Sequence, residues 1–399
     1  MPCSDLSLSA PTWDDRLGAA AWTRVAESSD ADAAILIGVL GPARSWQWLR
    51  DGASVDALAT QSRALSGAAA AHLGEAAKRW RPRVEGVDPE ADIDRIRRLG
   101  GTFLMPGDAH WPATLTDVPD PVPWGLWVRG NTAALAGVAD RGVAIVGARA
   151  ASRYGMNATH QIVAGACDAG IGIVSGGAFG VDTAALRCAC AFDVPVVAVL
   201  AGGLDQWYPA QNTRLFETIQ TSGAICSFYP PHSRAARWRF LDRNRIIAGL
   251  CAGTVVVEAG ARSGALNTAK HARDLGRHLG AVPGPIDSAQ SVGCHELLRS
   301  GAQIITSGRD IAEMIAPIGD VKPAHLAKPT GLLDGLDQTS ARVFDAMPAV
   351  EAATVDSIQR AAGLALSDVL SALAGLEMSG KIQREGGKYR RVAAEEVAS

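Results

Sequence analysis

The sequence predicts an α/β protein with a parallel sheet as its core, a small helical domain before it and a winged-helix-like domain after it. Short apolar runs alternate with helix-length amphipathic stretches between residues 141 and 307, a pattern typical of parallel sheets built from strand–helix units. The apolar runs are continuous rather than alternating, as expected of strands buried on both faces. A chain of 399 residues has room for two or three such domains.

The first domain is expected over residues 1–105, which are alanine-rich and helical in pattern. We expect its tryptophans to fill the domain core. They are Trp13, Trp22, Trp46, Trp48 and Trp80. A short connection, "DVPDPVPWGLWVRGN", then leads to Arg141.

The sheet domain is expected over residues 106–317. The runs that predict its strands are 143–147, 171–174, 195–200, 224–226, 254–258, 278–282 and 303–306. Amphipathic stretches such as 156–169, 180–191 and 264–276 predict helices between them.

The last domain is expected over residues 338–399, after a linker at 318–337 that is rich in proline and glycine. Within it, "VDSIQRAAGLALSDVLSALAGLEMSG" predicts a helix, a glycine turn and a second helix. A hairpin around Gly386 and Gly387 should follow, which is the outline of a winged helix.

Composition describes an ordinary globular protein, with 48% hydrophobic residues, 20% charged residues and a formal net charge of -3. The sequence has no apolar run long enough for a membrane span and no secretory signal at its start, so we expect a cytoplasmic protein. The seven cysteines include no CxxC pair, which gives no reason to expect a metal site.

The candidate site lies in the turns that follow the strands. Glycine-rich turns follow five of them, as "VGARAASRYG", "SGGAFGVD", "AGGLDQWYP", "EAGARSGALNTA" and "VPGP", the last with Pro283 and Gly284. In a parallel sheet these turns meet at one edge, where backbone N–H groups and helix N-termini bind anions. No P-loop or GxGxxG spacing is present, so a nucleotide triphosphate or a dinucleotide cofactor is not expected. We expect Asp182 to cap the helix that it enters.

Segment 233–245, "SRAARWRFLDRNR", holds five arginines and one acid. We expect Asp242 to cap a helix "DRNRIIAGL", so that Arg243, Asn244 and Arg245 begin it beside the glycine-rich turns. Arg234, Arg237 and Arg239 would then lie on the preceding loop, as a solvated surface or as a ramp for DNA. Phe240 is expected to be packed, and the role of Trp238 stays open.

The motifs VGAR, SGGAFGVD, GGLDQWYPAQN, RFLDRNRIIAGL, VVVEAGARSGALNTA and VPGP follow one another in this order. Over roughly residues 105–305 the chain thereby resembles the DNA-processing protein A family (DprA, also called Smf). The resemblance implies a helical N-terminal domain of the SAM or helix-hairpin type, an extended Rossmann-like core and a C-terminal winged helix.

The resemblance also implies a function. Members of this family are not enzymes and are usually homodimers through the Rossmann-like core. They bind single-stranded DNA and load the RecA recombinase onto it in natural transformation, and we expect no cofactor. The residues implied for DNA binding are Gly147, Arg149, Ser175, Gly176, Gly177, Gly202, Gly203, Tyr208, Arg243, Asn244, Arg245, Ser263, Gly264 and Thr268.

Three positions depart from the usual family pattern. Ala210 stands where a lysine is common, with Arg214 on the next helical turn; Phe228 replaces a glutamate and Leu186 a histidine. We expect these changes to alter the details and the affinity of binding rather than its existence.

Two alternatives stay open. Nucleoside-monophosphate phosphoribohydrolases have a similar Rossmann-like fold, although their PGGxGTxxE pattern is absent and Glu258 precedes the loop. A transcription factor acting through the last domain is the other, because the hairpin 381–391 is basic and would contact nucleic acid or dock a protein. Its basic residues are Lys381, Arg384, Lys388, Arg390 and Arg391.

Overall fold

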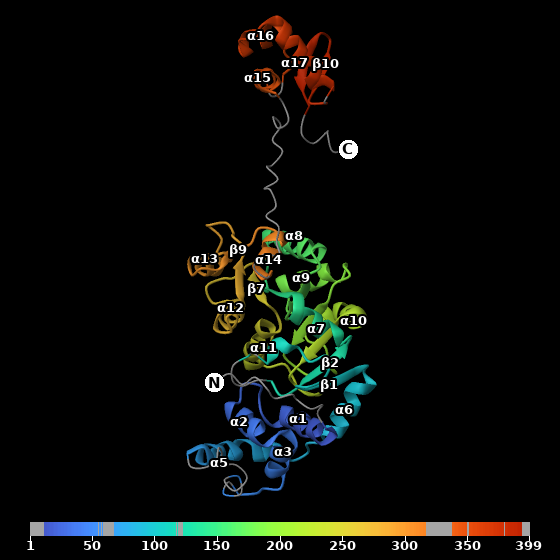
Figure 1. Cartoon of the computed structure of the whole chain (residues 1–399), viewed down its shortest axis with the longest axis vertical. Helices are drawn as coiled ribbons and strands as arrows, with labels where there is room; N and C mark the ends of the chain where they lie inside the picture. Colours follow the sequence, from blue (N-terminus) through green and yellow to red (C-terminus); the bar gives the residue numbers. More distant parts are fainter. Residues whose placement is uncertain are drawn as a thin grey trace. The chain divides into compact units, whose positions relative to one another are not determined.

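The structure, a computed structural model, describes residues 12–54, 68–116, 123–316, 337–348, 351–378 and 380–392, with Asp56, Leu58 and Val118. The chain divides into two compact units, Met1–Val321 and Lys322–Ser399, which are taken separately below (Figure 1). The linker expected at 318–337 lies outside the described residues, apart from Asp337.

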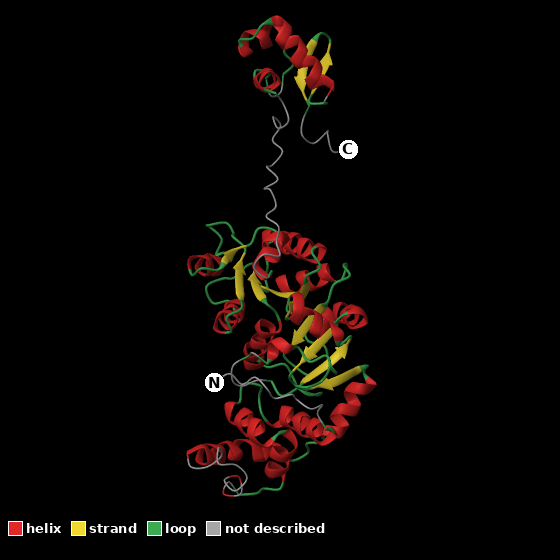
Figure 2. Cartoon of the chain, viewed as in Figure 1, coloured by secondary structure: helices red, strands yellow, loops and turns green. Residues whose placement is uncertain are grey.

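The first unit is built on one sheet (Figure 2), in which nine strands of the described residues lie in the order β1-β2-β6-β5-β4-β3-β7-β8-β9. The strands from β6 to β9 in this order are parallel to one another, and β2 is antiparallel to both β1 and β6. Each apolar run predicted as a strand overlaps one of β3 to β9. The strands are β1 (Gly101–Leu104), β2 (Leu126–Gly130), β3 (Gly142–Val146), β4 (Gly172–Ser175), β5 (Val196–Leu200), β6 (Ala224–Ser227), β7 (Gly253–Val256), β8 (His278–Ala281) and β9 (Gln303–Ile304).

Helices cover both faces of the sheet, as the continuous apolar strands predict. In β3, Ile145 packs toward α8, α9, α10 and α14, whereas Ala144 and Val146 pack toward α7, α11, α12 and α13. The predicted α/β class is therefore confirmed. The helices are α7 (Ala133–Arg141), α8 (Arg153–Asp168), α9 (Val181–Ala189), α10 (Thr213–Ser222), α11 (Arg237–Leu250), α12 (Gly264–Asp274), α13 (Val292–Arg299) and α14 (Gly308–Ile315).

The antiparallel edge was not predicted, because the apolar runs indicate no strand before residue 143. Phe103 of β1 packs on Trp127 of β2 with ring centroids 4.6 Å apart, and the Trp127 indole N–H donates to Thr23 Oγ1 at 3.1 Å. These two strands thus depend on contacts with the N-terminal helices, which a local pattern does not show.

The N-terminal helices enclose a core of tryptophans. Trp22 and Trp80 meet edge to face at 5.1 Å, and the Trp22 indole N–H donates to the buried Ser45 hydroxyl at 2.9 Å. Trp46 and Trp48 are also buried, but Trp13 is 44% exposed, so the expectation is wrong for that residue. The helices are α1 (Trp13–Val25), α2 (Ala31–Leu40), α3 (Pro42–Arg50), α5 (Ala68–Trp80) and α6 (Pro89–Arg98).

Helix α11 begins earlier than predicted. It starts at Arg237, after Ala236 as the N-cap residue, so Arg237 and Arg239 lie on the helix and not on a loop. Asp242 is not its cap; its carboxylate accepts hydrogen bonds from the Tyr229 hydroxyl at 2.9 Å and from the Ser28 hydroxyl. Arg243, Asn244 and Arg245 lie in the middle of the helix and are buried.

The capping role expected of Asp182 is also wrong. Gly180 is the N-cap residue of α9, at a φ of 74° that favours glycine. Asp182 lies in the first turn, where its carboxylate accepts a hydrogen bond from the Ala178 N–H at 3.3 Å. It therefore ties the glycine-rich loop to the helix.

The second unit is three helices followed by a hairpin: α15 (Gln338–Asp345), α16 (Val355–Ala362), α17 (Leu366–Met378), β10 (Ile382–Glu385) and β11 (Lys388–Arg391). Gly363 ends α16 in the left-handed conformation, and the positive φ angles of Gly386 and Gly387 make the tight turn between the strands. Phe344, Ile358 and Leu373 share its core. The predicted helix, glycine turn, helix and hairpin are confirmed.

The close packing of α14 on α8 predicts that a side chain at Gly308 lowers the stability of the protein. A Cβ at Gly308 would lie 2.2 Å from the Ala166 nitrogen and from the Gly165 carbonyl carbon, and backbone atoms cannot yield as a side chain can. We expect Gly308→Ala to lower the free energy of unfolding by about 1–3 kcal/mol in urea titrations. Gly38→Ala is the control, because Gly38 lies on α2 with open space around it; it should stabilise by about 0.5–1 kcal/mol. A Gly308→Ala protein as stable as the wild type would contradict this packing.

Candidate functional site

A pocket of about 790 Å³ lies at the carboxyl edge of the sheet, between α11 and the loops after β3, β4, β5 and β7. The chain runs outward from β3 through β4 on one side and from β7 through β8 on the other, so the pocket sits where the strand order reverses. Open α/β sheets bind ligands at this point. The loop after β8, with Pro283 and Gly284, does not contribute to the lining.

Eight of the fourteen predicted site residues come together in this pocket. They are Gly147, Arg149, Tyr208, Arg243, Asn244, Ser263, Gly264 and Thr268. The lining also holds Arg237, which was expected on a loop as a solvated surface or a ramp for DNA, and Arg262, which was not singled out from the sequence. Arg262 directly precedes Ser263, so its place in the chain was a usable signal.

Three pocket arginines are exposed: Arg149, Arg237 and Arg262. Within the described part of the chain, none of the three forms an ion pair with a carboxylate. Unpaired guanidinium groups at the rim of a pocket favour the binding of an anion, and their planar donors match phosphate oxygens.

The Phe240 ring lies beside two of the pocket arginines, Arg149 and Arg243. The Arg149 guanidinium lies 5.1 Å and the Arg243 guanidinium 5.8 Å from the centroid of the Phe240 ring, within the range of cation–π attraction. Tyr208, which is exposed, lies 5.8 Å from the same ring. Phe240 is half-buried and lines the pocket, so it is packed, as expected, and also faces the site. Trp238 on the first turn of α11 is 61% exposed.

Arg243 forms the floor of the pocket. Its Nη1 donates to the Gly176 carbonyl at 2.5 Å and to the Val199 carbonyl, and the side chain is buried. Burial lowers the pKa of Arg243 to about 10, with the charge of Asp182 acting in the opposite direction. The group therefore stays protonated at neutral pH and places a positive charge below the exposed arginines.

Asp182 is the acidic residue of the lining. Burial raises the pKa of its carboxyl group above the ordinary value, and the positive charge of Arg243 offsets part of this rise. The four arginines of the lining thus outweigh its carboxylate, and the pocket is positive in a chain whose net charge is -3.

Helix α12 adds a helix N-terminus to the site. The Ser263 hydroxyl caps it by accepting a hydrogen bond from the Ala265 N–H at 3.3 Å, and the first turn lines the pocket. Asn244 holds α11 to this turn through bonds to the Gly264 carbonyl at 3.3 Å and to Asn267 at 3.2 Å. The positive end of the helix dipole is therefore presented to the pocket.

Six predicted site residues do not line the pocket: Ser175, Gly176, Gly177, Gly202, Gly203 and Arg245. Instead, these residues make contacts that hold the loops and the helix around the pocket. The Ser175 hydroxyl donates to the Ile145 carbonyl at 2.6 Å, and the Gly203 N–H donates to the Ser233 carbonyl at 2.8 Å. A Cβ at Gly176 would lie 2.4 Å from Arg243 Nη1, and Arg245 donates to the Ser28 carbonyl at 2.6 Å.

Two of the departures from the family pattern are core residues. Leu186 is buried under the sheet, and Phe228 packs edge to face on Trp124 with centroids 5.0 Å apart. Ala210 is exposed next to the rim residue Tyr208, without lining the pocket. A lysine at this position would therefore stand near the rim rather than at the floor of the pocket.

Comparison with protein families identifies the family of this chain. Residues 102–316 match the family model described as DNA recombination-mediator protein A, and residues 327–388 match the model of the DprA winged helix domain. The chain belongs to the DNA recombination-mediator protein A family. The resemblance seen in the motifs is confirmed, and with it the winged-helix-like class of the last domain.

Known members of the family are similar along most of the chain. The DNA processing protein DprA of Mycobacterium tuberculosis is 38% identical over 390 residues, which cover 94% of this chain and 95% of that protein. Protein Smf of Escherichia coli is 32% identical over 297 residues, 72% of this chain and 77% of the relative. The X-ray structure of DprA from Streptococcus pneumoniae superposes with a TM-score of 0.62 at 28% identity, covering 77% of this chain and 100% of that chain.

No helix among the described residues has both the length and the apolar character that crossing a membrane requires.

The raised pKa of Asp182 predicts a pH dependence. The folded protein binds this proton more tightly than the unfolded chain, in which the ordinary value is 3.8. The stability that Asp182 contributes is therefore fully present below about pH 3.8 and is lost as the pH rises through the raised pKa. Asp182→Asn removes this titration.

We expect the wild type to lose stability relative to Asp182→Asn as the pH is raised from 4 toward 8 in a series of urea titrations. A difference in unfolding free energy that stays constant over this interval would show that the carboxyl group titrates at its ordinary pKa.

Proposed function

We propose that this protein binds single-stranded DNA without sequence preference in the arginine pocket and loads the RecA recombinase onto it, in natural transformation and recombination. The observation that carries the proposal is a set of exposed arginines around the pocket at the switch point of the sheet. They are Arg149, Arg237 and Arg262, and none has a carboxylate partner among the described residues. Family membership supports it, because the family model is described as a recombination mediator.

The pocket chemistry supports a nucleic-acid backbone as the ligand. Phosphates can pair with Arg149 and its neighbours, while bases stack on exposed rings such as Tyr208 and Trp238. Every base has a π face, so stacking of this kind tolerates any sequence. Duplex DNA hides its bases from such rings, which favours the single-stranded form.

The phosphoribohydrolase alternative receives no support from Glu258. This residue is 2% exposed, and its carboxylate accepts hydrogen bonds from the Ser152 N–H at 2.9 Å and from the Ser152 hydroxyl at 2.5 Å. It holds the N-terminus of α8 and does not line the pocket. A binding protein without catalysis is therefore the function we propose.

The remaining expectations belong to the same proposal. We propose a cytoplasmic homodimer that pairs through the Rossmann-like core. We also propose the division into a helical domain at 1–105, a DNA-binding core at 106–317, a linker at 318–337 and a winged-helix-like domain at 338–399.

The substitution Arg149→Ala tests most directly whether the pocket binds DNA. If it neutralises one phosphate, Arg149→Ala should weaken binding to oligo(dT). It should also reduce the slope of log K against log salt concentration by about 0.7, the value for one phosphate of a single strand. Fluorescence anisotropy at a series of salt concentrations measures both. Arg309→Ala is the control, since Arg309 pairs with Glu313 at 2.7 Å on α14, a helix that contributes nothing to the pocket lining.

Wild-type affinity that does not change with salt, or an Arg149→Ala protein that binds as the wild type does, would refute the pocket as a DNA site.

RecA loading is tested separately, on single-stranded DNA coated with single-strand-binding protein. The wild type should shorten the lag before RecA begins to hydrolyse ATP, because RecA hydrolyses ATP on the filament that it forms. Arg149→Ala should shorten it less, and Arg309→Ala should act as the wild type does. A wild type that binds oligo(dT) but leaves the lag unchanged would exclude RecA loading and retain DNA binding.

A further inference from the structure

Helix α11 makes different contacts on two of its faces. Arg237, Phe240, Leu241 and Asn244 line the pocket, with the spacing of one helix face. Arg239, Asp242 and Arg245 project from a different side, three residues apart. This second face contacts the N-terminal helical domain and not the pocket.

The contacts come from one turn, between α1 and α2. Glu27 accepts two hydrogen bonds from the Arg239 guanidinium, at 3.2 and 3.3 Å. The Ser28 hydroxyl donates to the Asp242 carboxylate, and the Ser28 carbonyl accepts from Arg245 at 2.6 Å. Glu27 and Ser28, together called the α11 clamp here, therefore engage three polar residues on this face of the helix.

The α11 clamp is backed by a buried aromatic ring. The Tyr229 hydroxyl donates to the same Asp242 carboxylate at 2.9 Å, and the Arg239 guanidinium lies 4.5 Å from the Tyr229 ring centroid. Ser28 is 1% exposed, so water does not replace its bonds when they are lost. We therefore expect a shift of α11 when Ser28 is changed, and also when the two hydrogen bonds between Glu27 and Arg239 are weakened.

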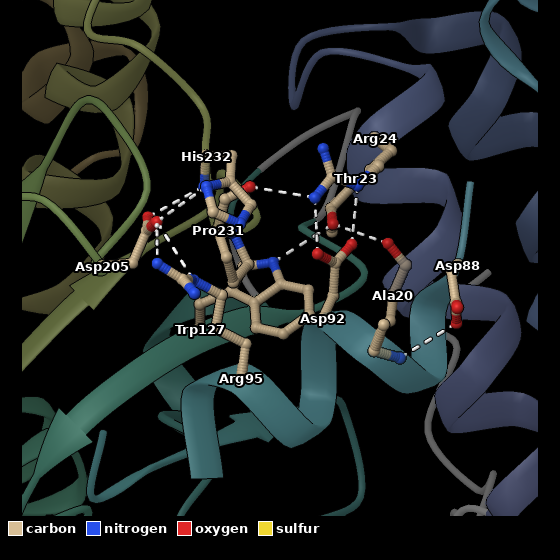
Figure 3. Close-up of polar contacts among 11 residues, drawn as sticks. Ala20, Thr23, Arg24, Asp88, Asp92, Arg95, Trp127, Asp205, Pro231 and His232 are labelled. Carbon is tan, nitrogen blue, oxygen red and sulfur yellow. Dashed lines mark hydrogen bonds and ion pairs between the residues drawn. The ribbon is translucent and has the colours of Figure 1, made fainter. Parts of the chain in front are cut away.

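A second set of contacts holds the loops that carry the pocket rim (Figure 3). Arg95 of α6 pairs with Asp205 at 3.2 Å, and Asp205 also accepts the His232 N–H at 2.8 Å. Arg24 of α1 donates to the Pro231 carbonyl at 3.0 Å while it pairs with Asp92. These loops lead to Tyr208 and Ala235, which line the pocket.

We propose that the N-terminal helices position the DNA pocket by holding the face of α11 that does not line it. Glu27 and Ser28 are then positioning residues for DNA binding, although neither lines the pocket. The inference rests on the proposed function. It also reassigns two of the five arginines of segment 233–245: Arg239 and Arg245 dock the N-terminal helices, while Arg237 and Arg243 face the ligand.

The direction in which Glu27→Gln changes DNA affinity distinguishes positioning of α11 from a purely electrostatic effect of the Glu27 charge. Removing a carboxylate near a polyanion site should strengthen DNA binding if charge alone matters. If the α11 clamp positions the helix, the same change should weaken binding by about three- to tenfold, which lies within the range of coupling between residues in contact. Ser28→Ala should weaken binding in the same direction without a change of charge.

Two further measurements identify positioning. The slope of log K against log salt concentration should stay at the wild-type value in Glu27→Gln, because the arginines of the lining are unchanged. Deuterium exchange of the amides of residues 237–245 should become faster in both variants, while exchange in α8 stays the same.

Two controls complete the design. Glu75→Gln breaks an exposed ion pair with Lys78 in the same domain, at 2.7 Å, and should leave affinity and exchange unchanged. Gly308→Ala lowers global stability at a distance from the α11 clamp and should leave the affinity of the folded protein unchanged.

The outcomes are distinct. Binding of Glu27→Gln and Ser28→Ala that equals or exceeds the wild type would overturn the inference, whether or not exchange in α11 becomes faster. A wild type that fails to bind oligo(dT) would refute the proposed function, and the exchange of residues 237–245 would then decide whether the α11 clamp sets the helix. If amide exchange of residues 237–245 is unchanged in both variants, the positioning of α11 by the α11 clamp is refuted as well.

Discussion

The buried guanidinium of Arg243 is the interaction on which the site depends. Its Nη1 bonds the Gly176 carbonyl after β4 and the Val199 carbonyl in β5, and so fastens α11 to the ends of two central strands. A buried charge is costly unless its donors are used, and a cationic donor bonded to backbone carbonyls is a strong arrangement. Gly176 is needed because any Cβ there would collide with this guanidinium. Gly176 does not line the pocket, and this contact gives it a structural reason to be glycine.

Fixing α11 in this way also fixes what each of its faces meets. One side carries Arg237 and Phe240 to the pocket, and the opposite side carries Arg239 and Asp242 to the turn at Glu27 and Ser28. In the proposed arrangement, α11 transmits the position of the N-terminal helices to the ligand site. This follows from close packing, since a helix held on both sides cannot move at one without moving at the other.

The sheet and the edge that carries the site were predictable from sequence because they depend on local patterns. Apolar runs such as 195–200 mark buried strands, and glycines such as Gly147 follow them at positions that a parallel sheet brings together. The start of α11 was not predictable in this way, because Arg-Trp-Arg has the composition of a solvated loop and Asp242 resembles a cap. The partners of the Asp242 carboxylate are Ser28 and Tyr229, which lie outside α11, and only tertiary packing brings them to the helix. The strand β2 was missed for the same reason.

Pairing, rather than composition, decides where the chain is positive. Arg16, Arg24 and Arg239 are each matched by a carboxylate within the first unit, at 2.7, 2.5 and 3.2 Å, and contribute little to the outer field. Charges more than about 8 Å apart are screened at physiological ionic strength, so distant acids do not neutralise an exposed cluster. The pocket arginines that have no carboxylate partner in the described part of the chain then set the local potential. A chain with a net charge of -3 can in this way present a strongly positive site, because the charge that a ligand meets is the charge that the fold has left unpaired.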